Sequence, residues 1–130
     1  MLESDKEIKN LPEKSVIYNP FKSVYYASRG VYVGFCREPN LLLQTVIGVL
    51  SSLVLIYNNL YLLALVDIVM MFFTLSSEFL NTAIETLCDL VHPTYSLKVK
   101  IIKDLAAAGV WMIALAWLVF LIYSGYQVLS

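Results

Sequence analysis

The chain has 130 residues, of which 59% are hydrophobic, and its mean hydropathy is +0.73. Soluble domains are about 45–50% apolar, and the excess here is concentrated in three long runs, so the sequence predicts an integral membrane protein of one domain. The formal net charge of −1 argues against a nucleic-acid partner, which requires a basic surface. The two cysteines, Cys36 and Cys88, do not form the paired motif of a zinc site.

The segment before the first apolar run has two parts. Residues 1–20 are polar and charged and contain two prolines, which predicts a mobile cytoplasmic tail. Residues 21–37 repeat apolar and aromatic side chains at intervals of three and four, with basic residues between them, which predicts an amphipathic helix. Such a helix can lie in the lipid–water interface, and packing on a soluble partner is the alternative.

Three apolar segments follow, at residues 39–57, 61–90 and 105–126, and each predicts a membrane-spanning helix. A helix over residues 61–90 would be about 45 Å long, which exceeds the hydrocarbon thickness of about 30 Å. Its last two or three turns should therefore reach the headgroup layer or water. Residues 94–104 are predicted to form a loop that could include the start of the third helix.

The basic residues fix the expected orientation. All nine Lys and Arg residues precede the first span or lie between the second and the third. Because positive charge is retained on the cytoplasmic side of a membrane, we expect a multi-pass membrane protein whose basic segments face the cytoplasm. Its N-terminus would be cytoplasmic and its C-terminus outside.

The end of the second span carries a face of polar side chains. At about 100° per residue, Glu78, Asn81, Glu85 and Asp89 fall within an arc of about 80°. Asp67 falls on the same face, nearer the outer leaflet, and we predict that its carboxylate points into the helix bundle. An acid within a membrane is costly, so such residues usually face a bundle interior or a functional site.

These residues suit phosphoryl transfer at a membrane surface. Desolvation favours Glu78 as a general base. Glu38 precedes the first span at the level of Glu85, and paired carboxylates suit Mg²⁺ shared with phosphates. Lys103 begins the third span at that level, where an ammonium can hold a phosphate.

Other interpretations stay open at this point. Asp89, Asp104 and the nearby lysines could be solvated residues at helix ends, with Lys103 paired to either aspartate. A small transporter or proton-relay bundle could use Asp67, Glu78 and Glu85 as a file of acids. A non-catalytic assembly protein is a third possibility, although it has no need of a deep glutamate.

The stretch Glu78-Phe-Leu-Asn81-Thr-Ala-Ile-Glu85, followed by Asp89 and by Lys103-Asp104, resembles the signature of the prokaryotic diacylglycerol kinase family, which includes undecaprenol kinases. Gly30 and Glu38 also match, and the likeness covers roughly residues 21–123. It departs at Leu42, where the family has arginine, and at Gln44, where the family has an acid or histidine.

The resemblance implies a homotrimer of three-span subunits with shared active sites, which phosphorylates a lipid hydroxyl from Mg-ATP. It implies Glu78 as the base and Asn81 as a residue that orients the site, while Glu38 and Glu85 would hold Mg²⁺ with the ATP phosphates. Further nucleotide contacts would be Tyr26, Asp89, Lys103 and Asp104, and Ala107 would lie beside the lipid. Diacylglycerol and undecaprenol both stay open as the acceptor.

Overall fold

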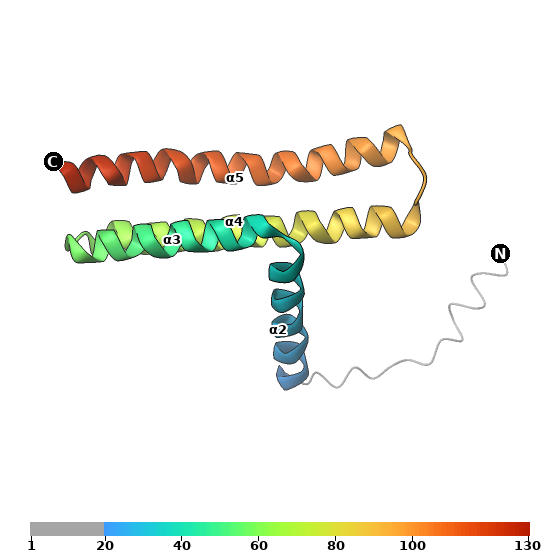
Figure 1. The fold of residues 1–130 in the computed structure, drawn as a ribbon, viewed down its shortest axis with the longest axis horizontal. Helices are drawn as coiled ribbons and strands as arrows, with labels where there is room; N and C mark the ends of the chain where they lie inside the picture. Colours follow the sequence, from blue (N-terminus) through green and yellow to red (C-terminus); the bar gives the residue numbers. More distant parts are fainter. Residues whose placement is uncertain (1–19) are drawn as a thin grey trace, which may run out of the picture. The chain divides into compact units, whose positions relative to one another are not determined.

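The computed structural model describes residues 20–130, and every regular element in that range is an α-helix. The helices are α2 (Pro20–Arg37), α3 (Pro39–Tyr57), α4 (Tyr61–Val91) and α5 (Leu97–Leu129) (Figure 1). The last three are long and apolar enough to cross a membrane. The structure therefore confirms the predicted all-α membrane fold, whereas the predicted tail lies outside the described residues apart from Pro20.

By its internal contacts the chain divides into a unit that ends at Gly30 and a second unit, Val31–Ser130. The helix α2 starts in the first unit and ends in the second. In its last turn Gly34 is buried, and a Cβ there would overlap the ring of Phe79 on α4. The absence of a side chain at Gly34 thus allows the end of α2 to pack closely on α4.

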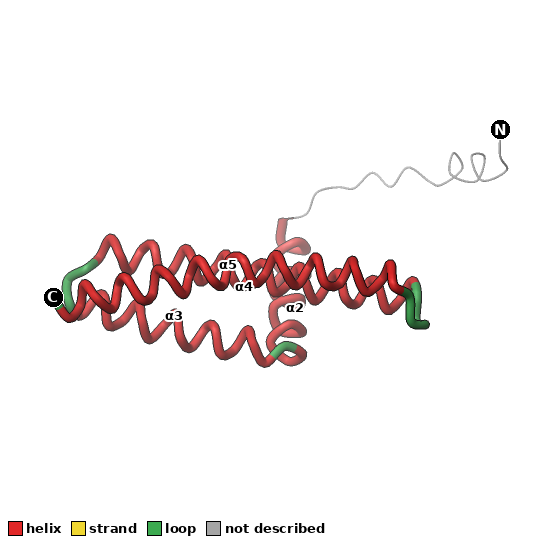
Figure 2. The backbone as a smooth tube through the Cα atoms, turned by 90° about the horizontal axis from the view of Figure 1, so that it is seen from above, coloured by secondary structure: helices red, strands yellow, loops and turns green. Residues whose placement is uncertain are grey.

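Within the second unit, α4 is the central helix. It packs along both α3 and α5, whereas α3 and α5 touch each other little (Figures 1 and 2). The buried apolar cluster combines one residue of α3, two of α4 and one of α5, namely Leu41, Met71, Leu75 and Trp117. Because α4 contacts both neighbours, its polar face meets side chains from each of them.

The connection between α3 and α4 is short. Asn59 has a φ of 60°, and asparagine tolerates this left-handed conformation better than most residues with a side chain. Earlier in α3, Gly48 lies against Met71 of α4, where a Cβ would overlap the methionine side chain. The turn and this glycine together bring the two helices into close antiparallel contact.

The helix α5 differs from the segment predicted for the third span. It begins at Leu97, eight residues before the predicted position 105, and it ends at Leu129, beyond the predicted position 126. The lysines that suggested a loop lie on its first two turns, where Lys100 forms an i,i+4 ion pair with Asp104 at 2.7 Å. Charged residues are compatible with a helix that extends beyond the hydrocarbon, and α5, with 33 residues, is about 50 Å long.

Candidate active site

The site begins with Glu78, which α4 holds between α3 and α5. Only 6% of this residue is exposed, so the acid predicted to be desolvated is indeed buried. Its Oε1 accepts a hydrogen bond of 2.7 Å from Nε2 of Gln44 on α3. An ionised carboxylate only accepts hydrogen bonds, and a charge-assisted bond of this kind fixes its orientation.

A cleft of about 200 Å³ opens beside this pair. Gln44 and Glu78 supply its polar part, and one side of α5 supplies the rest, with Val110, Trp111, Ala114, Leu115 and Leu118. Ala107, the predicted neighbour of the lipid, is half-buried about one turn before these residues and does not line the cleft. Apolar walls around a buried carboxylate suit the reacting end of a lipid alcohol.

Asn81, three residues after Glu78 on α4, contacts the next acid along the helix. Its Nδ2 donates to Oε1 of Glu85 at 3.0 Å, while its Oδ1 is buried without a partner among the described residues. An unpaired carbonyl oxygen next to a carboxylate belongs to the donor type that Mg²⁺ prefers. These two residues therefore fit a shared cation site, although no group of three acidic, histidine or cysteine side chains that could hold a metal occurs within residues 20–130.

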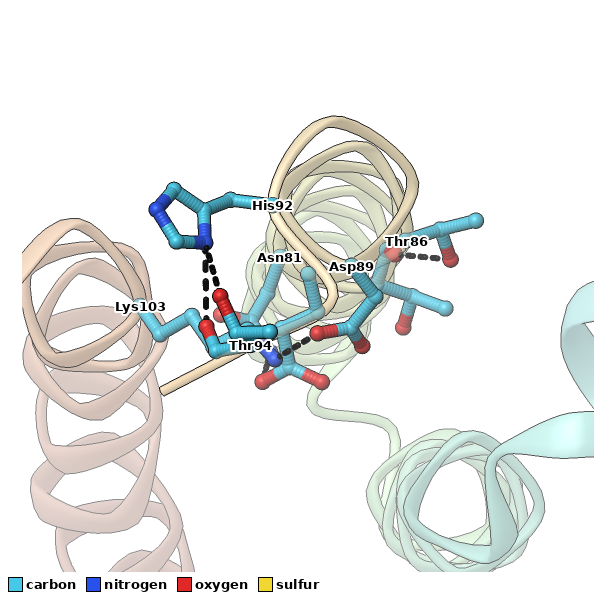
Figure 3. Close-up of polar contacts among 8 residues, drawn as sticks. Asn81, Thr86, Asp89, His92, Thr94 and Lys103 are labelled. Atoms are coloured by element: carbon cyan, nitrogen blue, oxygen red, sulfur yellow. Dashed lines mark hydrogen bonds and ion pairs between the residues drawn. The ribbon is translucent and has the colours of Figure 1, made fainter. Parts of the chain in front are cut away.

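Lys103 joins α5 to α4 near the loop that connects these two helices. It reaches from α5 to α4, where its Nζ donates to Oδ1 of Asp89 at 2.6 Å (Figure 3). Glu85 adds a further electrostatic attraction to this ammonium. Of the two aspartates considered as partners of Lys103, the structure thus selects Asp89, because Asp104 pairs with Lys100. Lys103, Asp89 and Asp104 also line a second hollow of about 400 Å³ formed with the α4–α5 loop.

Two further predicted site residues lie at or before the start of α3. Glu38 directly precedes α3 in an extended conformation and is half-buried. Tyr26, on the first half of α2, is 63% exposed and makes an edge contact with the ring of Tyr25. Neither residue has a contact that tests its expected role with metal or nucleotide, so both roles stay predictions.

Asp67 lies apart from these residues and is fully buried. Its carboxylate accepts hydrogen bonds from Ser51 at 2.5 Å, from Ser52 at 2.8 Å and from the indole of Trp117 at 2.8 Å. The prediction that Asp67 points into the bundle is confirmed. Among the described residues, the hydrogen bonds of Asp67 and those of Glu78 involve different side chains.

The comparison with known families bears on this arrangement of residues. A family model described as prokaryotic diacylglycerol kinase matches residues 25–124, which include every site residue discussed above. The chain belongs to this family. Membership identifies it as a prokaryotic membrane lipid kinase of the diacylglycerol or undecaprenol kinase type. No curated protein and no solved structure matched the chain.

Proposed function

We propose that this kinase transfers the γ-phosphate of Mg-ATP to the hydroxyl of a membrane lipid, either diacylglycerol or undecaprenol, with Glu78 as the general base. The observation that carries the proposal is the burial of Glu78 beside an apolar cleft, 6% exposed and bonded to Gln44. Burying an acid is costly, so a buried carboxylate in the wall of a cleft indicates a chemical role.

The reaction needs one proton acceptor at the lipid end. The hydroxyl gives its proton to the Glu78 carboxylate as its oxygen forms a bond to the γ-phosphorus. The bond between that phosphorus and the bridging oxygen of ADP breaks, and ADP leaves with the electron pair. Glu78 later returns the proton to solvent or to the leaving product.

The nucleotide would bind at the last turns of α4 and the first turns of α5. Lys103 would bind phosphate oxygens once it leaves Asp89, whose side chain is 67% exposed. An exposed ion pair is screened by water and contributes little to stability, so Lys103 can exchange Asp89 for phosphate at low cost. We assign Asp89, Asp104 and Tyr26 to further contacts with the nucleotide.

Asn81, Glu85 and Glu38 are the residues that would hold Mg²⁺ together with the ATP phosphates. When bound, Mg²⁺ neutralises charge that develops on the transferred phosphoryl group. Independently of the ion, the amide of Asn81 orients the Glu85 carboxylate through their 3.0 Å hydrogen bond. The unpaired Oδ1 of Asn81 supports a cation at this end of the site.

The two ends of the site are far apart on a single chain. Glu85 lies seven positions after Glu78, which is about 10 Å along the axis of α4. A phosphoryl group cannot cross that distance in one step, so we propose that a second subunit of a homotrimer completes the site. Mixing Glu78→Gln subunits with Lys103→Met subunits, at a Mg-ATP concentration below the parent KM, tests this idea, because shared sites would give more activity than the two variants measured separately.

The proposed orientation puts the α4–α5 loop in the cytoplasm, where ATP is available. At 31 and 33 residues, both helices are long enough to project beyond the hydrocarbon. Reporter domains fused after Ser130 should therefore behave as non-cytoplasmic, and reporters inserted at Thr94 as cytoplasmic.

The activity itself is tested with purified protein in lipid micelles. Labelled phosphate from Mg-ATP should appear on diacylglycerol or on undecaprenol, assayed separately. The absence of transfer to either alcohol would overturn the proposal, and the preferred acceptor would identify the branch of the family.

A further inference from the structure

Gln44 makes a contact that the family match does not explain. It is a polar residue in the first half of the apolar helix α3, and its amide nitrogen donates to the Glu78 carboxylate at 2.7 Å. The opposite orientation of the amide would place its oxygen against a carboxylate oxygen, which is repulsive. With Nε2 on the carboxylate, Oε1 is the end of the Gln44 amide that points away from Glu78.

That orientation leaves the carbonyl oxygen without a hydrogen bond. Oε1 of Gln44 is buried and has no partner among the described residues. A buried acceptor without a donor is destabilising, and an occurrence in a native fold calls for an explanation such as a ligand. Gln44 and Glu78 both line the same cleft, so a molecule in the cleft can supply the donor.

The cleft selects the chemistry of that molecule. Glu78 and the carbonyl of Gln44 are both acceptors, so they disfavour a phosphate or a carboxylate and favour a donor. The five residues that α5 contributes are apolar, which suits a neutral group on a hydrocarbon chain. A lipid alcohol meets both conditions with its single O–H.

We propose that Gln44 is a positioning residue for the lipid acceptor. Its N–H holds the Glu78 carboxylate, and its Oε1 accepts the hydrogen bond of the lipid hydroxyl before transfer. The hydroxyl proton then passes to Glu78 while its oxygen attacks phosphorus, and Gln44 itself neither gains nor loses a proton. This inference rests on the proposed lipid kinase activity and identifies the part of the site that binds the neutral alcohol.

The test compares Gln44→Leu with the matched variant Gln127→Leu, which makes the same change near the end of α5, away from the cleft. Rates are measured with a short-chain diacylglycerol and with a polyprenol as acceptors, first at saturating Mg-ATP and then with Mg-ATP varied. Gln44→Leu should lower kcat/KM for the acceptor about tenfold or more, because the lipid hydroxyl loses its acceptor and the Glu78 carboxylate loses the bond that holds it. The KM for Mg-ATP should stay within about twofold.

The outcomes separate the two proposals. If the parent protein phosphorylates no lipid alcohol, the kinase assignment itself is wrong. If the parent is active and Gln44→Leu matches Gln127→Leu for both substrates, or shifts both KM values equally, the role of Gln44 is refuted.

A purely structural role is also distinguishable. Misfolding lowers the active fraction and hence kcat, but it leaves the acceptor KM of the remaining active molecules unchanged. If Gln44→Leu does not fold, Gln44→Asn replaces it, since the shorter amide stays polar but cannot reach both partners. Failure of both variants to fold, while Gln127→Leu folds, would assign Gln44 to structure alone and overturn the inference.

Discussion

Replacing Glu78 by glutamine is the sharpest test of the proposed chemistry. The new amide has nearly the same volume, and its carbonyl can still accept the 2.7 Å hydrogen bond that Gln44 donates in the parent. The variant should therefore fold and keep the cleft. It lacks a proton acceptor, however, and loss of a general base lowers kcat by about 10²–10⁴, or about 3–5 kcal/mol in activation free energy.

The same variant should leave nucleotide binding almost unchanged. In the proposed reaction Glu78 contacts the lipid hydroxyl, whereas Glu85 and Glu38 hold the metal with the ATP phosphates. The assay measures transfer of labelled phosphate to lipid at varied Mg-ATP, with the KM for Mg-ATP expected within about twofold of the parent value. Glu85→Gln provides the contrast, because it should raise that KM as well as lower turnover.

Two results would refute this reasoning. Turnover of Glu78→Gln at the parent rate would show that another group accepts the proton. A rise in the KM for Mg-ATP as large as that of Glu85→Gln would show that the two ends of the site are not separate.

Three further substitutions, together with one control substitution, test residues in and around the site. Trp117→Phe removes one donor from the buried carboxylate of Asp67 and should cost about 1–3 kcal/mol, measured as a lower midpoint of thermal unfolding in micelles; an unchanged midpoint would contradict the bond. Gly48→Ala should cost about 1–3 kcal/mol by overpacking α3 against α4, whereas Gly125→Ala, which has open space at its Cβ, should leave the midpoint unchanged. Lys103→Met should raise the KM for Mg-ATP about tenfold or more while the acceptor KM stays constant, and an unchanged nucleotide KM would remove this lysine from the phosphate site.

The helices could be predicted well from the sequence where apolar and polar stretches alternate sharply. Pro39, the paired asparagines after Tyr57 and His92-Pro93 set the ends of α3 and α4, and the observed bounds agree within one residue. The start of α5 could not be placed in this way. Its first two turns are as charged as a loop, but they continue a long helix and carry an i,i+4 ion pair between Lys100 and Asp104.

The site was predictable along one helix and not between helices. The 3.6-residue period placed Glu78, Asn81 and Glu85 together, and the hydrogen bond between the last two agrees with that placement. No periodicity relates α3 to α4, so the contact of Gln44 with Glu78 could not be derived from spacing. The available signal was Gln44 itself, a polar side chain early in an otherwise apolar span.

The polar atoms, more than the apolar surface, indicate what the single chain lacks. Much of α5 is exposed, but lipid tails cover apolar side chains as well as protein does, so this exposure does not require a partner. The buried oxygens of Gln44 and Asn81 are different, because the hydrocarbon tails of lipids offer them no donor or cation. The oxygen of Gln44 lies beside the apolar cleft, at the lipid end of the proposed site. The oxygen of Asn81 lies beside Glu85, at the nucleotide end. We infer that lipid alcohol satisfies the first and the metal–nucleotide complex the second, which would explain why a stable helix bundle retains both.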